Sequence, residues 1–327
     1  MKTFLALAFL AFPVSLFAQH AKTFDATYTA TIAKVPSGLD QLEVWIPLPE
    51  SRGWQHVSDL KIDAPFAFTR HTEKEFGNQY AFASIPNPPA GDLTVRVSFK
   101  ATREEAIKPT ETTATRAQIA RGLRADRLVT LSPRVRQLSK QITRGISDPY
   151  EQAHAIFNYL IVTMKYDKTI PGWGQGDTER ACDVKAGNCT DFHSLFISLA
   201  RANEIPARFV IGFPLTASDG TVKGYHCWAE FYVKGRGWIP VDASDASKLQ
   251  DPDAQQYLFG HLDPNRIQFT MGRDLKLVPR TAQALNYFIY PHAEANGKVV
   301  GEPAIALTFR EVRRTASVIP NRLRGSE

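Results

Sequence analysis

The stretch KAGNCTDFHSLFISLARANEIPARFVIGF, residues 185–213, places a cysteine at the predicted start of a helix. Apolar residues recur at helical spacing directly after Cys189, namely Phe192, Leu195, Phe196 and Leu199. This spacing predicts a helix whose apolar side faces the core, and the run ARFVIGF then predicts a strand. Two more strand candidates, YHCWAEFYV and GWIPVDA, follow. The stretch therefore indicates an α+β unit in which a cysteine-bearing helix precedes an antiparallel sheet.

Another helix is predicted upstream, in SDPYEQAHAIFNYLIVTMKYD. Ser147 or Asp148 can cap this helix, and Pro149 suits its first turn. Its apolar residues recur on one face: Ala153, Ile156, Phe157, Leu160 and Met164. The glycine-rich loop KTIPGWGQGDTERACDVKAGN then leads to Cys189.

Residues 22–100 have a different pattern, with β-branched and aromatic residues in near alternation and turn-rich pieces such as PSGLD and PNPPAGD between them. This pattern predicts an all-β, sandwich-like domain over residues 19–104, and the threonine-rich segment 105–115 suits a linker. The α+β domain is then expected over residues 116–312. Strands in LNYFIYPHAEANGKVV and PAIALTFREV are expected to complete it, followed by a basic tail at 313–327.

The chain begins with a basic Lys2, an apolar run and the small residue Ala18. This pattern is typical of a cleaved secretory signal over residues 1–18, so the mature protein is expected to be exported, to the periplasm or beyond the cell. No later segment has the roughly 18 uninterrupted apolar residues that a spanning helix needs. The mature protein is therefore not expected to span a membrane.

A net charge of +6 could indicate an anionic partner, and residues 116–144 are rich in arginine. The arginines are interrupted by apolar residues and lack interleaved aromatic residues that would stack on bases, so we predict solvated helix faces and no nucleic-acid partner. The three cysteines, Cys182, Cys189 and Cys227, cannot all pair within one chain. At least one thiol is left over, and pairing of Cys182 with Cys227 remains open.

Cys189 has the position that a reactive thiol needs. The first turn of a helix lowers a thiol pKa, because unpaired backbone N–H groups and the helix dipole favour the thiolate. Gly187 would let a substrate backbone approach closely, and the N–H of Cys189 could point at a developing oxyanion. Cys189 is therefore a candidate nucleophile.

Such a nucleophile needs a base and a group that orients the base. Alternation along HCWAEF puts His226, Trp228 and Glu230 on one face of the strand and turns Cys227 away, toward the core. The polar face, with His226, should then be displayed. Asp242 ends the next strand, where it could accept the second N–H of the imidazole.

The motifs GNCTDF, HCWAEF and GWIPVDAS, joined by IPARFVIGF, resemble the transglutaminase-like superfamily, which has a papain-like core. The resemblance covers about residues 132–291. It implies a triad in which Cys189 is the nucleophile, His226 the general base and Asp242 the orienting acid. It also implies an acyl-thioester intermediate formed from an amide and resolved by water or by an amine, with no metal or organic cofactor.

Several residues near this triad keep alternative roles. Gln175 and Trp173 each carry a side-chain N–H that could reach the oxyanion, but their loop could equally be structural. His193 lies on the face of Cys189 and is interpreted as structural or substrate-lining, and Trp228 is a substrate-lining candidate. A zinc site formed by Cys182, Cys189, His193 and Cys227 is disfavoured, because six residues separate the first two cysteines.

The resemblance favours hydrolysis of a peptide or amide over crosslinking, with a peptide or protein substrate and cell-wall peptide as one candidate. A crosslinking acyltransferase and a non-catalytic binding protein on the same fold are the alternatives. Because all three triad positions are filled, catalysis is preferred to loss of function.

Overall fold

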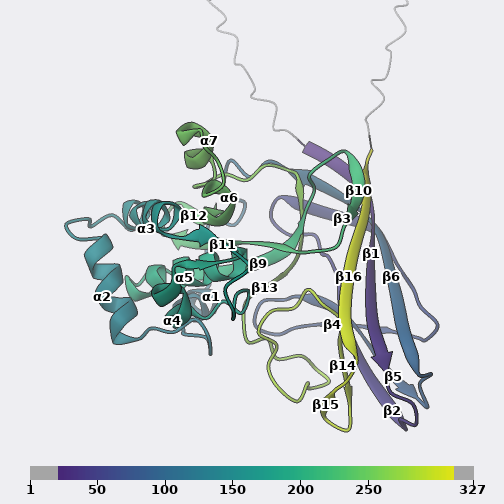
Figure 1. Cartoon of the computed structure of the whole chain (residues 1–327). Coiled ribbons are helices and arrows are strands. Elements are labelled where there is room, and N and C mark those ends of the chain that lie inside the picture. Colours follow the sequence, from purple (N-terminus) through teal and green to yellow (C-terminus); the bar gives the residue numbers. More distant parts are fainter. Residues whose placement is uncertain (1–20, 313–327) are drawn as a thin grey trace, which may run out of the picture.

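The computed structural model describes residues 21–312, and the predicted signal segment 1–18 and basic tail 313–327 lie outside this range. Figure 1 shows long strands on one side of the molecule and a group of helices on the other. The long strands form two five-stranded sheets. In sheet order the first comprises β10 (Asp219–Val222), β16 (Glu302–Glu311), β1 (Ala21–Val35), β6 (Gly91–Glu104) and β3 (Gln55–Asp63). The second comprises β15 (Lys298–Val299), β14 (His292–Ala295), β2 (Gln41–Pro47), β5 (Gln79–Pro86) and β4 (Thr69–Thr72).

The alternation in the N-terminal strands is confirmed by their burial. In β1, five residues two apart are buried: Phe24, Ala26, Tyr28, Ala30 and Ile32. They belong to the same apolar core as Leu42, Val44 and Ile46 of β2. The two sheets therefore share one core, as the alternating pattern requires of strands with one buried face.

The predicted strands after residue 285 exist, but their expected placement was wrong. β16 pairs with β1 from Phe24 opposite Glu311 to Ala33 opposite Glu302, and β14 pairs with β2. Both strands thus extend the N-terminal sheets instead of completing the α+β domain. Local periodicity identifies a strand but not its partner, and here Phe24 pairs with Glu311 and His292 with Trp45, far apart in the chain.

The cysteine-bearing region has its own four-stranded sheet, with the order β12 (Gly237–Val241), β11 (His226–Val233), β9 (Ala207–Pro214) and β13 (Arg266–Met271). A short parallel pair of strands, β7 (Lys165–Tyr166) and β8 (Ala186–Gly187), precedes this sheet in the sequence. The helices are α1 (Arg116–Leu123), α2 (Pro133–Ile142), α3 (Pro149–Thr163), α4 (Thr178–Val184), α5 (Cys189–Ala202), α6 (Ala243–Ala246) and α7 (Pro252–Tyr257). Among the described helices, none has the length and apolar character needed to cross a membrane.

Both predicted helix starts are confirmed. Asp148 caps α3, where its carboxylate accepts from the N–H groups of Tyr150 and Glu151 at 2.7 and 3.2 Å. Helix α5 begins at Cys189 after the N-cap Asn188. It packs against β9 and β11 and is flanked by α2, α3 and α4. All of its residues from Cys189 to Arg201 are buried, so this helix lies inside the domain and not at its surface.

The sandwich packs directly on the four-stranded sheet. The Gln55 side chain exchanges two hydrogen bonds of 2.9 Å with the backbone of Gln268. Tyr28 of β1 contacts Phe213 and Phe269, with ring centroids 5.8 and 5.0 Å apart. Nearly all residues of β9, β11, β12 and β13 are buried, so the sheet that follows the cysteine helix is covered on both faces.

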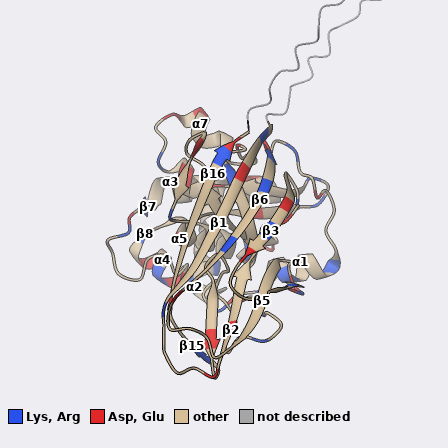
Figure 2. Ribbon diagram, turned by 90° about the vertical axis from the view of Figure 1, so that its right-hand side faces the viewer, with Lys and Arg blue, Asp and Glu red and all other residues tan. Residues whose placement is uncertain are grey.

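The long-stranded face carries charges of both signs, as Figure 2 shows along β1, β6 and β16. Lys100 lies 3.9 Å from Asp25 and 3.8 Å from Asp59, and Arg310 lies 3.7 Å from Asp25. Because these charges are exposed and paired, the net charge of +6 does not form a uniform basic surface on this face.

Candidate active site

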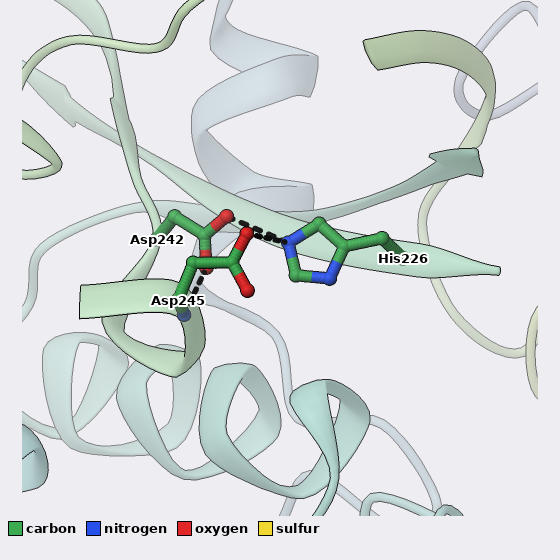
Figure 3. Close-up of side chains that lie close together, drawn as sticks. All are labelled: His226, Asp242 and Asp245. Carbon is green, nitrogen blue, oxygen red and sulfur yellow. Dashed lines mark hydrogen bonds and ion pairs between the residues drawn. The ribbon is translucent and has the colours of Figure 1, made fainter. Parts of the chain in front are cut away.

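The structure brings Cys189, His226 and Asp242 together from three elements. Cys189 is the first residue of α5, His226 is the first residue of β11, and Asp242 directly follows β12. Because β11 and β12 are antiparallel neighbours, the beginning of one strand lies beside the end of the other. The His226 Nε2 lies 2.6 Å from Asp242 Oδ2 (Figure 3).

An ionised carboxylate only accepts hydrogen bonds, so His226 Nε2 carries a proton that it donates to Asp242. Asp242 Oδ2 also accepts from Arg266 Nη1 at 2.8 Å. Burial raises the pKa of the Asp242 carboxyl, but His226 and Arg266 outweigh it and hold this pKa well below its usual range. The carboxylate is therefore charged while fully buried.

The pKa values of the His226 imidazole and of the Cys189 thiol are shifted in opposite directions. Burial opposes the charge on His226, but Asp242 and Asp245 raise the pKa of its imidazole well above the usual value. Burial also opposes ionisation of Cys189, but hydrogen bonds to Cys227 and His226 and the charge of His226 hold the pKa of the thiol well below its usual value. The arrangement therefore favours a thiolate–imidazolium pair at the start of a helix, where the helix dipole adds to the stabilisation of the anion.

Asp245 is a second carboxylate near the imidazole that the sequence pattern did not indicate. Its Oδ2 lies 3.4 Å from His226 Nε2 (Figure 3), and its other oxygen, Oδ1, pairs with Lys248 at 2.7 Å. Among the described residues, His226, Asp242 and Asp245 are close enough together to hold a metal ion. The guanidinium of Arg266 already neutralises Asp242 from the other side. The two carboxylates are therefore better suited to balancing the charge of the His226 imidazolium than to binding a divalent cation.

His193 lies behind the triad and not on an open surface. Its side chain is fully buried, and Nδ1 donates to the backbone oxygen of Cys189 at 2.8 Å. Burial is the main cause that lowers the pKa of its imidazole, so the ring is neutral. Nε2 is 3.5 Å from Asp242 Oδ1. Of the two roles suggested from the sequence, this position fits the structural one.

Trp228 and Glu230 do share a face with His226, but the expectation that this face is displayed was wrong. Trp228 is only 1 % exposed, and the guanidinium of Arg266 lies over its ring. Glu230 binds Arg208 at 2.7 Å inside the protein. Because Trp228 is buried, it has no surface left for lining a substrate path. Cys227, as expected, is a buried core residue, and both Cys182 and Cys227 are free thiols.

The glycine-rich loop before α4 is fixed by a buried carboxylate, Asp191. Its oxygens accept from the backbone N–H groups of Gly174 at 2.7 Å, Gly176 at 3.1 Å and Asn188 at 2.9 Å. A side chain on Gly187 would meet this carboxylate at 2.2 Å. The contact with Asp191 therefore already requires a glycine at this position, and the approach of a substrate backbone to Gly187 stays a prediction.

Replacing Asp191 with asparagine is expected to loosen this loop. The asparagine amide would point an N–H donor at one of the three backbone N–H groups that the carboxylate now accepts from. Losing charged hydrogen bonds of this kind lowers the free energy of unfolding by about 2 kcal/mol. The unfolding midpoint and the reactivity of Cys189 should both fall. Asp183→Asn in the neighbouring helix α4, where the side chain is 61 % exposed, is the matched control and should change neither. Equal unfolding midpoints in the two variants would contradict the role given to Asp191.

Trp173 and Gln175 lie on this loop and, with Asn188, line a pocket of about 460 Å³. The backbone oxygen of Gln175 accepts from Arg273 and from Asn286, each at 2.9 Å, while its side chain remains exposed. The residues that line the pocket are Tyr166, Lys168, Trp173, Gly174, Gln175, Asn188, Lys223, Gly224, Tyr225, Tyr287 and Tyr290. Which side chain donates to an oxyanion remains a prediction.

Sequence reasoning missed most of the residues that support the triad. Asp191 could have been identified from the sequence, because an acidic side chain at the third position after an Asn cap is the signature of a capping box. Arg266 and the tyrosines come from segments far from residue 189, and no local signal connects them to it. Only the folded chain brings them together.

Fold and site together resemble the arrangement of a papain-like cysteine enzyme, with a thiol at a helix start and a histidine–aspartate pair on the adjoining sheet. Residues 136–243, which contain all three side chains, match the sequence model of the transglutaminase-like superfamily. Over that segment the chain is similar to this superfamily.

A relative from Haemophilus influenzae, named only "Uncharacterized protein", is 29 % identical over 321 residues, covering 85 % of this chain and 86 % of its own length. The crystal structure of a "Putative Cysteine Protease" from Cytophaga hutchinsonii is similar over 90 % of this chain and 92 % of its own, with a TM-score of 0.62 and 16 % identity. The periplasmic domain of TgpA from Pseudomonas aeruginosa matches with a TM-score of 0.37, 17 % identity and coverage of 69 % of this chain and 90 % of its own. The first solved structure confirms the mixed fold.

Proposed function

We propose that this protein is an exported cysteine-dependent amide hydrolase that acts on peptides. The observation that carries the proposal is the buried pair of His226 and Asp242, at 2.6 Å, beside a thiol whose pKa is held well below its usual value. A thiol that served only packing would have no need of this charge arrangement. Burial alone would raise the pKa of such a thiol, as it does for Cys182, where it reaches about 11.

In the proposed reaction the Cys189 thiolate attacks the amide carbonyl carbon, and the carbonyl oxygen becomes an oxyanion. The N–H of Cys189 has no acceptor within its own helix, because it lies in the first turn, and can donate to that oxyanion. His226 gives its proton to the leaving nitrogen, the C–N bond breaks, and an acyl thioester remains.

Deacylation reverses these roles. His226, now neutral, removes a proton from water, and the hydroxide attacks the thioester carbonyl. The C–S bond breaks, a carboxylic acid leaves and the thiolate–imidazolium pair is restored. Asp242 and Arg266 keep the imidazole in one orientation throughout.

Transfer of the acyl group to an amine is the second candidate reaction. Lys168 and Lys223 line the pocket beside the site, and no described acidic residue lines it. An approaching lysine ammonium would be repelled there, which favours water over a cationic amine as the acceptor. A binding protein without chemistry would not require the charged triad described above.

Trapping the acyl enzyme tests the proposal. Purified protein is incubated with a peptide library or a cell-wall extract, quenched in acid and digested, and an acyl mass is expected on the peptide that contains Cys189. Cys189→Ala should carry no adduct. Turnover with no adduct, or an adduct on Cys182 instead, would rule out the mechanism. Export is proposed from the N-terminal sequence alone, and the amino-terminal residue of protein from a periplasmic fraction tests it.

A further inference from the structure

The pocket beside Asn188 has an unusual combination of walls. Four tyrosines and a tryptophan line it, together with two lysines, and none of the described lining residues is acidic. Trp173 is 38 % exposed, a high value for so large an aromatic ring. A pocket lined by aromatic rings and by cations suits a ligand that is in part flat or apolar and in part anionic.

The pocket is electrostatically coupled to the nucleophile. Burial is the largest cause that raises the pKa of Tyr166, Tyr225, Tyr287 and Tyr290, and the charge of Cys189 is among the further causes for each of them. These phenols are therefore neutral and bring no negative charge. Tyr225 is also bonded to the first turn of α5: its hydroxyl accepts from Asn188 Nδ2 at 3.1 Å and lies 3.0 Å from Thr190 Oγ1.

The two lysines carry charge that the described part of the protein does not neutralise. Lys168 Nζ lies 5.6 Å from the ring centroids of Tyr166 and of Trp173, and within residues 21–312 neither it nor Lys223 forms an ion pair. Asp167, the carboxylate next to Lys168 in the sequence, accepts instead from the N–H and the hydroxyl of Thr169, both at 2.7 Å. Lys248, close by over Tyr166, is by contrast paired with Asp245.

We infer that this pocket selects acidic peptides, in which a carboxylate lies next to the amide that Cys189 attacks, through Lys168 and Lys223. The inference rests on the proposed function, because the substrate is taken to be a peptide amide. Two unpaired ammonium groups beside a buried thiolate attract an anion to a site that would otherwise repel it. A single-stranded nucleic acid has the same combination of rings and charge, but the pocket adjoins a nucleophile suited to amides.

The test compares two alkylating reagents that differ in charge. Iodoacetate and iodoacetamide both form a bond between their CH₂ carbon and the Cys189 sulfur as the carbon–iodine bond breaks and iodide leaves, which adds a carboxymethyl or a carbamoylmethyl group; only iodoacetate is an anion. The ratio of their second-order rate constants measures the preference of the site for negative charge. It does not depend on a known substrate.

The double variant Lys168→Gln, Lys223→Gln should lower the iodoacetate-to-iodoacetamide ratio by about fivefold. A change of this size corresponds to the loss of one exposed ion pair. Lys168→Glu with Lys223→Glu should lower it further. Raising the salt concentration should lower the ratio in the unchanged protein, because exposed charges are screened. Lys298→Gln, in the exposed strand β15, is the matched control and should leave the ratio unchanged.

A peptide pair extends the test to turnover. Two peptide amides identical except for glutamate or glutamine beside the scissile bond should differ in kcat/KM by a similar factor, and the double lysine variant should remove the difference. An unchanged alkylation ratio in that variant would overturn the inference. Protection of Cys189 by a short oligonucleotide but not by the glutamate peptide would overturn it too. Failure of the proposed function is distinct, because then no acyl adduct forms while the alkylation ratio can still be measured.

Discussion

His226→Gln is expected to abolish amide turnover and to shift the alkylation of Cys189 to the pH of an ordinary thiol, about 8.5, or above it. In the unchanged protein, hydrogen bonds to Cys227 and to the imidazole, together with the charge of His226, keep the thiol ionised well below that pH. Without the ring, burial opposes ionisation and the leaving nitrogen receives no proton. A loss of ~10³-fold or more in kcat follows from removing a general acid–base group together with its activation of the nucleophile.

His193→Gln is the matched control for this prediction, because the two histidines are neighbours and only one is placed to act on the thiol. His193 is bonded to the backbone oxygen of Cys189, a contact that a glutamine amide can also make. Rates of iodoacetamide alkylation between pH 5 and 10, with turnover of one peptide amide, separate the variants. If the change at 193 removed turnover and the change at 226 did not, the assignment of the base would be reversed.

Asp242→Asn is expected to combine a large loss of activity with a large loss of stability. A neutral amide cannot hold the imidazole in its donating orientation or balance its charge, and comparable changes cost about 10⁴-fold in kcat. It also leaves Arg266 and His226 buried without their shared anion. Removing one partner of a buried ion pair lowers the free energy of unfolding by roughly 3–5 kcal/mol.

The pH dependence of that stability difference has a defined sign. The pKa of Asp242 is depressed in the folded protein, so its contribution is present above about pH 3.9, the unfolded value, and is lost as the pH falls through the folded value. The pKa of His226 is raised, so its contribution is complete below about pH 6.5 and is lost as the pH rises through the folded value. The difference between the unchanged protein and Asp242→Asn should therefore be largest between about pH 4 and 6.5.

Asp263→Asn controls for the loss of any carboxylate beside Arg266. Asp263 binds the other guanidinium nitrogen at 2.9 Å, but its side chain is 36 % exposed, so water compensates when it is removed. Urea unfolding of both variants at pH 5 and pH 8, followed by tryptophan fluorescence, measures the difference. Equal effects of the two substitutions, or a loss at position 242 that does not depend on pH, would contradict the role given to Asp242.

The sequence by itself determined the elements that carry the site. An amphipathic pattern placed Cys189 at the start of a helix, and the strand patterns placed His226 on one strand and Asp242 at the end of the next. The structure has Cys189 first in α5, His226 first in β11 and Asp242 directly after β12. These features depend on interactions between residues a few positions apart. Such interactions leave a period of 3.6 or 2 in the sequence.

Only the tertiary structure decided that both faces of β11 are buried, which strands complete each sheet, and which groups surround the triad. The pairing of β16 with β1, the cover over Trp228 and the contacts of Arg266 and Asp191 all join residues distant in the chain. Their partners are selected by packing and by the cost of leaving a buried charge unpaired, which depend on the whole fold and leave no local period.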